Sequence, residues 1–391
     1  MKKHTRPRTL EAPIREDLTR KMVFIAGPRQ VGKTTLARSI LATERSGAYF
    51  SWDRREDRRI VLSGALPPPP SLVVLDEFHK YRSWKRWLKG EWDAHGGEYR
   101  FLVTGSARLD VYRRGGDSLQ GRYHHYRLHP FTAGEASGRL VAPAPSAPLA
   151  LDRAVSKDLV GDLLRYGGFP EPLFAGNARA HRRWRKERLD RFFREDVRDL
   201  ETVRDLSSME LLADLLPSRV GSPLSLDSIR GDLDVSHRAV SRWMQILERL
   251  YFAHRVPPFE TTRVRALKKQ PKAYLWDWSL VPEPGARFEN LIAAHLLRLC
   301  HYLEDVDGFA VSLHYLRDAS KREVDFLVTF DRKPWFAVEA RLGGSDVSPH
   351  LRYFGSRLRI PHLYQVVLEG RDFVHEGVRV VPAAKFLAAL P

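Results

Sequence analysis

A short apolar run followed by a glycine-bounded loop is the feature that most constrains this chain. Residues 22–26 are typical of a buried strand, and residues 36–41 are typical of a helix. Between them stand Gly27, Pro28, Arg29, Gln30, Val31, Gly32, Lys33, Thr34 and Thr35. Glycines at both ends let main-chain N–H groups converge on phosphates at a helix N-terminus. This order favours a site for ATP over a plain glycine-rich turn, with Lys33 on the β- and γ-phosphates and Thr34 on Mg²⁺.

A second apolar run ends in two carboxylates. Residues 71–75 read as a parallel strand covered on both faces, and Asp76 and Glu77 follow directly. By itself such a run is more often a strand that ends at the surface. Together with the upstream loop, it predicts that Asp76 holds Mg²⁺ and that Glu77 orients or deprotonates the attacking water.

Polar residues also follow the predicted strand at 101–104. The carboxyl ends of parallel strands meet at the crevice where open α/β sheets bind ligands. Thr104 or Ser106 is therefore expected to sense the γ-phosphate, and capping of the strand end is a nearly equal alternative.

Composition places the chain among globular proteins. It has 391 residues, 43% hydrophobic and 29% charged, and a formal net charge of +17. This charge favours polyanions such as nucleic acid, although an arginine-rich coding background gives the same bias. One cysteine, Cys300, excludes a disulfide within the chain and predicts a reducing, cytoplasmic setting. No run approaches the ~20 apolar residues of a membrane span, so no membrane partner is expected.

Pattern changes along the chain predict an α/β fold with three parts. Residues 1–141 are expected to form a P-loop ATPase core, a parallel sheet with helices on both faces. Residues 142–149 read as an extended linker. Residues 150–265 are expected to form a helical, winged-helix region, and residues 266–391 a small α/β domain.

The middle part contains a helix-turn-helix pattern. Two capped helices, at 225–233 and 236–250, are separated by a turn of the appropriate length, and a strand follows at 251–256. If the second helix enters a major groove, four side chains face the bases: His237, Arg238, Ser241 and Arg242. Winged helices inside ATPases also serve as lids or assembly surfaces, and this role and contact with DNA are about equally expected.

The last third carries three acidic residues, one on a predicted helix and two on predicted strands. Glu289 begins an apolar helix, and Asp325 and Glu339 lie on predicted strands. Three carboxylates on one edge of a small sheet predict a second metal site, suited to one or two Mg²⁺ ions and to phosphodiester cleavage.

Together these motifs identify a family. Residues 26–35, 75–80, 104–106, 119–123, 166–170, 269–274 and 323–326 match its motifs in order. The chain resembles the uncharacterised bacterial and archaeal AAA-type ATPases whose C-terminal half is a domain of unknown function. The resemblance implies an ATPase core, a winged-helix middle and a C-terminal fold similar to PD-(D/E)XK nucleases. Nuclease-like members carry Glu-x-Lys where this chain has Glu339-Ala340-Arg341, and arginine cannot act as a base.

The same resemblance suggests an arginine finger. Arg122 stands just before the last core strand, where AAA-type ATPases carry the residue that reaches a neighbouring subunit's γ-phosphate. Arg108 is the second choice, and a solvated or structural arginine is an equal alternative. A finger at Arg122 would favour a homo-oligomer.

These inferences predict an ATP-driven switch or motor that acts on DNA or on a partner. Two alternatives stay open: an ATP-gated, Mg²⁺-dependent DNA nuclease, and a non-enzymatic module that binds nucleic acid or protein.

Overall fold

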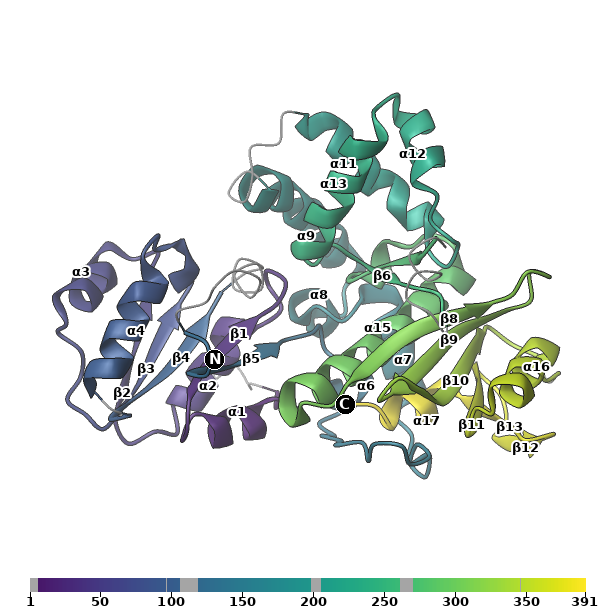
Figure 1. Cartoon of the computed structure of the whole chain (residues 1–391), viewed down its shortest axis with the longest axis horizontal. Coiled ribbons are helices and arrows are strands. Elements are labelled where there is room, and N and C mark those ends of the chain that lie inside the picture. The colour runs from purple at the N-terminus through teal and green to yellow at the C-terminus, as the bar shows by residue number, and fades with distance from the viewer. Residues whose placement is uncertain (1–5, 96, 106–118, 198–204, 261–269, 345) are drawn as a thin grey trace. The chain divides into compact units, whose positions relative to one another are not determined.

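The protein divides into two compact units in the computed structural model, Met1–His129 and Pro130–Pro391. The structure describes all residues except 1–5, 96, 106–118, 198–204, 261–269 and 345 (Figure 1).

The first unit is built on a five-stranded sheet whose strands are all parallel, in the order β2-β3-β4-β1-β5. Its strands are β1 (Met22–Ala26), β2 (Gly47–Ser51), β3 (Ser71–Asp76), β4 (Tyr99–Thr104) and β5 (Tyr123–Arg127). Its helices are α1 (Glu11–Asp17), α2 (Lys33–Leu41), α3 (Arg55–Ser63), the short η1 (Phe78–Lys80) and α4 (Trp84–His95).

Both faces of this sheet are buried, which explains the continuous apolar runs. Alternate strand residues such as Phe24 and Val73 pack with Val61 of α3 and Leu88 of α4 in one core cluster. The strand residues between them are also fully buried, and α2 packs against β2, β3 and β4. The predicted α/β fold with a parallel sheet is confirmed.

The second unit begins with helices and continues into a short hairpin. Its first elements are α6 (Ala133–Ala136), α7 (Lys157–Tyr166), α8 (Pro170–Ala175), α9 (Ala178–Arg191), η3 (Phe192–Val197), α11 (Leu206–Leu215), η4 (Leu216–Arg219), α12 (Leu226–Leu233) and α13 (His237–Arg249). The antiparallel strands β6 (Ala253–Val256) and β7 (Lys272–Leu275) follow. The predicted boundary between residues 265 and 266 lies outside the described residues and stays a prediction.

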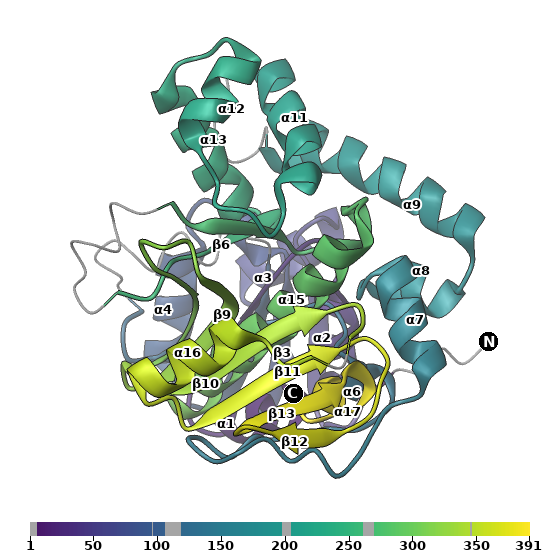
Figure 2. The same ribbon diagram turned by 90° about the vertical axis from the view of Figure 1, so that its right-hand side faces the viewer.

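A separate six-stranded mixed sheet, in the order β12-β13-β11-β10-β9-β8, completes the second unit (Figure 2). Its elements are η5 (Trp278–Leu280), α15 (Pro284–Asp307), β8 (Val311–Arg317), β9 (Glu323–Phe330), β10 (Lys333–Arg341), α16 (Pro349–Leu358), β11 (His362–Val367), β12 (Phe373–His375), β13 (Val378–Pro382) and α17 (Ala383–Ala388). The long helix α15 packs against β8, β9 and β10, and α16 packs against β9, β10 and β11. Cys300 is buried in α15.

No helix in the described part of the chain is both long enough and apolar enough to cross a membrane.

Candidate functional site

The loop between β1 and α2 needs its two glycines. Gly27 has φ 150°, and a Cβ there would lie 2.4 Å from the carbonyl oxygen of Leu128. Gly32 has φ 104° and is the N-cap of α2. Only glycine adopts these conformations at little cost, so the two positions fix the turn that leads into the helix N-terminus.

The side chain of Lys33 is held against this loop. Lys33 is 7% exposed, and its ammonium donates hydrogen bonds to the carbonyl oxygens of Gly27 (2.9 Å) and Pro28 (2.8 Å). A buried lysine is expected to be paired with an acceptor, and here these acceptors include neutral main-chain carbonyls. The loop therefore carries a full positive charge on its inner side, as binding of a polyphosphate requires.

The carboxylate of Asp76 accepts hydrogen bonds from three hydroxyl groups. Thr34 Oγ1 donates to Asp76 Oδ2 at 2.9 Å, Tyr49 Oη donates to the same oxygen at 2.5 Å, and Thr104 Oγ1 donates to Oδ1. The parallel register explains the contact with Thr104, because Asp76 lies opposite Thr104 on β4, whereas Tyr49 comes from β2 and Thr34 from α2. A hydroxyl and a carboxylate within 3 Å of each other are hard oxygen ligands that fit Mg²⁺.

Tyr49 is a component of this site that the sequence reasoning missed. Burial and the hydrogen bond to Asp76 raise the pKa of Tyr49 to about 12, against the opposing effect of Arg38. The Arg38 guanidinium lies 4.1 Å from the centre of the Tyr49 ring. The hydroxyl therefore keeps its proton and donates to Asp76. The feature that could have indicated Tyr49 is its position on β2, the strand that pairs with β3.

Glu77 stands immediately after β3 in a left-handed conformation, with φ 55°. Its carboxylate lies 3.7 Å from Lys80 Nζ and 3.7 Å from His79 Nε2, and Lys80 also pairs with Asp53 at 2.7 Å. Burial raises the pKa of Glu77, and the positive charges of Lys33 and Lys80 oppose this effect. A raised carboxyl pKa is a property that a general base needs.

The predicted sensor and finger residues have different outcomes. Thr104 is fully buried and directed to Asp76, whereas Ser106 and Arg108 lie outside the described residues. Arg122 precedes β5 and pairs with Asp93 at 3.0 Å. Since Tyr123 lies opposite Met22, Arg122 is at the end of the sheet away from the loop, about 16 Å of strand from Ala26. Action on a neighbouring subunit stays a prediction.

Of the three acidic residues predicted for the C-terminal part, Glu289 and Asp325 lie around a lysine, and the charge of Asp325 also acts on Glu339. Lys272 Nζ lies 3.2 Å from Glu289 Oε1, 2.7 Å from Glu323 Oε1 and 3.6 Å from Asp325 Oδ1. Lys272 is 1% exposed. Tyr274 donates to Glu289 Oε1 at 2.6 Å. We call Glu289, Glu323, Asp325, Glu339 and Lys272 the acidic cluster.

The acidic cluster differs from the predicted metal site. Within the described residues, no three acidic, histidine or cysteine side chains are arranged to hold a metal ion. An ammonium group lies among the carboxylates instead. Burial and the charge of Asp325 raise the pKa of Glu289 to about 7 and that of Glu339 to about 8. Arg341 stands 3.6 Å from Glu339.

Lys272 and Glu323 are the members of this cluster that the sequence reasoning did not assign. Both belong to short segments that matched the family, 269–274 and 323–326, but neither was given a role. Although burial lowers the pKa of Lys272, the carboxylates of Glu289, Asp325 and Glu323 raise it above its ordinary value. A lysine at the start of an apolar strand was the only local signal.

The predicted groove-facing residues lie on α13. Ser225 and Ser236 cap α12 and α13 as expected, accepting from the main-chain N–H groups of Ser228 and Ala239. One face of α13 is buried through Val240, Trp243, Met244, Ile246 and Leu247. His237, Arg238 and Arg242 are exposed, and Ser241 is half-buried. The arrangement presents a basic edge on the second helix of the pair.

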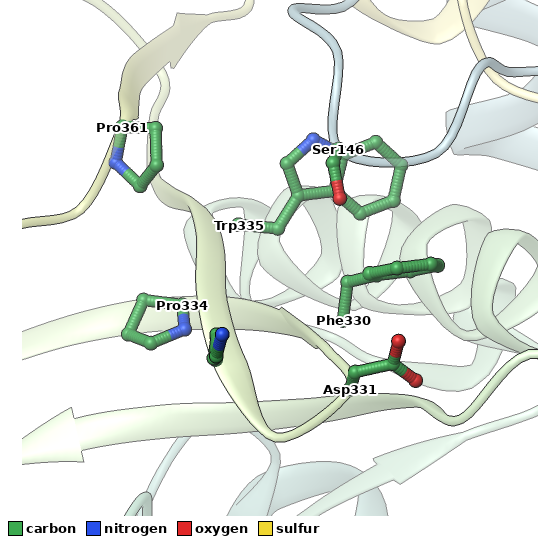
Figure 3. Close-up of a pocket in the computed structure, with 7 residues that line it drawn as sticks. Ser146, Phe330, Asp331, Pro334, Trp335 and Pro361 are labelled. Atoms are coloured by element: carbon green, nitrogen blue, oxygen red, sulfur yellow. The ribbon is translucent and has the colours of Figure 1, made fainter.

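A cavity of about 320 Å³ lies at the turn between β9 and β10 (Figure 3). It is lined by Phe330, Asp331, Lys333, Pro334, Trp335, Ser146 and Pro361. Trp335 Nε1 donates to the carbonyl oxygen of Ala147 at 2.8 Å, which attaches the linker to the sheet. The cavity contains none of the residues of the loop or of the acidic cluster.

Comparison with known protein families divides the chain into three matched segments. Residues 19–137 match the family described as "AAA domain". Residues 157–283 match "Domain of unknown function (DUF8612)", and residues 284–386 match "Domain of unknown function (DUF4143)". The chain therefore carries an AAA domain and a C-terminal domain of unknown function.

Two relatives align with most of this chain, and both are described only as uncharacterised proteins. An uncharacterised protein of Mycobacterium tuberculosis is 23% identical over 390 residues, which cover 94% of this chain and 81% of that protein. An uncharacterised protein of Methanocaldococcus jannaschii is 20% identical over 377 residues, with 91% and 83% covered.

Two solved structures are similar in part. The Walker-type ATPase PABY2304 of Pyrococcus abyssi has a TM-score of 0.45 and 14% identity, covering 73% of this chain and 97% of that one. The Orc1 protein of Aeropyrum pernix, in complex with DNA, has a TM-score of 0.33 and 15% identity, with 73% and 92% covered.

Proposed function

We propose that this protein is an ATP-binding and ATP-hydrolysing switch of the AAA type. The observation that carries the proposal is the hydrogen bond of 2.9 Å between Thr34 and Asp76 beside the Lys33 ammonium. Residues far apart in the sequence thereby form the pair that a magnesium–nucleotide complex requires. The matched AAA domain supports the same conclusion.

In this proposal each residue has a separate task. The main-chain N–H groups of the loop residues other than Pro28 and the Lys33 ammonium bind the phosphates, and Lys33 exchanges its main-chain carbonyls for phosphate oxygens. Thr34 and Asp76 would hold Mg²⁺, which neutralises charge on the phosphates when it is bound. Glu77 orients and deprotonates the attacking water.

Phosphate release from purified protein tests this function. We expect Lys33→Ala to lower the rate roughly 10²–10³-fold, the usual effect of removing one electrostatic donor from an active site. Lys157→Ala is the matched control, because Lys157 is exposed at the start of α7. Equal rates in the wild type and in Lys33→Ala would reject the proposal.

DNA is the partner that we propose for the switch. The support is the exposed basic edge of α13, which is the second helix of the predicted helix-turn-helix, and the net charge of +17. A lid or an assembly surface for a homo-oligomer is the competing role for this helix, and the cytoplasm is the proposed setting for either.

Fluorescence anisotropy with duplex DNA at several salt concentrations separates these roles. The double variant Arg238→Ala/Arg242→Ala should bind more weakly, with a salt slope smaller by about 0.9 for each phosphate that the protein no longer neutralises. Arg153→Ala/Arg357→Ala removes the same charge from exposed positions elsewhere in the second unit. Equal losses of affinity in the two double variants would favour a protein-facing role for α13.

A Mg²⁺-dependent nuclease is the second candidate function. It is favoured by Glu289 and Asp325 around one point and by the charge of Asp325 acting on Glu339, and it is weakened by Lys272 beside them and by Arg341 in place of lysine. Nicking of supercoiled plasmid that requires Mg²⁺ or Mn²⁺ and disappears in Asp325→Asn would establish it. Intact plasmid under these conditions would remove this candidate.

A further inference from the structure

Lys272 is the most deeply buried charge of the acidic cluster. It is 1% exposed, and its ammonium lies within 3.6 Å of carboxylate oxygens from three residues. An ammonium group has three N–H donors, and here three carboxylates surround it. Burial of a lysine is tolerated only when its charge is paired, and this pairing is multiple.

The oxygens of the cluster are also occupied by other donors. Tyr274 donates to Glu289 Oε1, and the main-chain N–H of Ala340 donates to Asp325 Oδ2 at 2.9 Å. Arg317 pairs with Glu323 Oε2 at 3.0 Å. These interactions compete for oxygens that a divalent cation would use, since such a cation takes six or more oxygen ligands at about 2.0–2.6 Å.

The segment before α12 closes one side of the cluster. A Cβ on Gly221 would lie 2.8 Å from Glu289 Oε2, so the main chain at residue 221 is packed directly on this carboxylate. Leu224 N also donates to the carbonyl oxygen of Pro271, next to Lys272. The cluster thus holds together the segment before α12, strand β7 and the C-terminal sheet.

We propose that Lys272 is the resident counter-ion of the acidic cluster, in the place that a divalent cation would otherwise take. The lysine comes from β7, whereas its partners come from α15 and β9. The pairing therefore clamps β7 and the segment before α12 to the C-terminal sheet. A divalent cation enters the cluster only if the ammonium leaves. The role of Lys272 does not depend on ATP hydrolysis in the first unit.

Manganese binding tests the proposal, followed by electron paramagnetic resonance in the full chain without nucleotide. All variants carry Asp76→Asn, so that the predicted magnesium position of the first unit does not contribute. With Lys272 present, we expect no saturable Mn²⁺ site up to millimolar concentration. Lys272→Met should gain one saturable site, and Glu339→Gln added to Lys272→Met should abolish that gain.

Thermal unfolding gives the second readout. Without metal, Lys272→Met should unfold at a lower temperature than Lys333→Met, whose lysine is exposed on β10, and Mn²⁺ should restore part of the loss. A saturable Mn²⁺ site in the chain with Lys272 that is lost in Glu339→Gln overturns the proposal. This measurement decides the matter even if Lys272→Met does not fold. Unchanged stability and no Mn²⁺ site in folded Lys272→Met would also overturn it.

Discussion

The two units of this protein each place a buried lysine among acidic residues, but they pair the charges in opposite ways. In the first unit, Lys33 donates to main-chain carbonyls while Asp76 accepts from hydroxyl groups. In the second unit, Lys272 donates to the carboxylates themselves. In the first arrangement, neutral groups hydrogen-bond both the Lys33 ammonium and the Asp76 carboxylate, and we propose that a magnesium–phosphate ligand replaces them. The second pairs an ammonium directly with carboxylates inside the fold, which is the basis of the clamp that we propose.

The largest expected effect that tests this contrast is a loss of ATP hydrolysis when Glu77 is replaced. Glu77→Gln keeps the size of the side chain and removes the base, so ATP hydrolysis should fall roughly 10²–10⁴-fold while ATP binding is retained. Because burial raises the pKa of Glu77, the wild-type rate should increase with pH as this carboxyl ionises, and the variant should lack this increase.

Single-turnover hydrolysis and equilibrium ATP binding measure the two quantities for Glu77→Gln. Glu91→Gln, a change of the same type on α4, is the control. Hydrolysis that survives in Glu77→Gln at the wild-type rate would contradict the role of Glu77 as a base.

An intermediate effect, on the pH dependence of folding stability, is expected from Glu339 in the second unit. Burial and Asp325 raise its pKa to about 8, from an ordinary value near 4.5, so the folded protein holds a proton that the unfolded chain releases. The proton on Glu339 stabilises the folded state fully below pH 4.5, and this stabilisation is lost as the pH rises to 8. Each unit by which the pKa is raised corresponds to about 1.4 kcal/mol of stability. Glu339→Gln should therefore gain stability relative to the wild type between about pH 5 and pH 8.

Urea unfolding of both proteins at several pH values tests this expectation. Glu339 Oε2 has no hydrogen-bond partner among the described residues, so the amide should cause little local loss. A difference between the two proteins that is constant with pH would show that Glu339 is ionised in the folded state.

The smallest effect is expected at Tyr49. Tyr49→Phe removes one of the three hydroxyl donors to Asp76, a net loss of about 1 kcal/mol, or roughly fivefold in an equilibrium. The Mg²⁺ concentration that gives half-maximal hydrolysis should rise by about this factor, with little change in the maximal rate. Tyr81→Phe is the control, since the Tyr81 ring stacks on Trp52. A fall in maximal rate without a change in Mg²⁺ requirement would contradict the positioning role of Tyr49.

The order of neighbouring residues in the sequence was sufficient to predict most of the loop site in the first unit. The turn at Gly27 and Gly32, the lysine and the hydroxyl are contiguous, and their geometry follows from a strand, a turn and a helix. Asp76 was also predictable, because parallel strands with buried faces must end at one edge of the sheet. The same reasoning could not place Arg122, since the direction of β5 decides at which end of the sheet it lies.

The sequence by itself determined the α/β class, the loop, Asp76 with Glu77 and the capped helices α12 and α13, because each depends on neighbours within one or two turns or strands. Only the tertiary structure decided what surrounds the carboxylates of the second unit. Lys272 is 17 residues from Glu289 and 53 from Asp325. No local pattern relates these positions. Their meeting depends on the packing of β7, α15 and β9, and it places the Lys272 ammonium beside carboxylates that the sequence predicted to hold a metal ion.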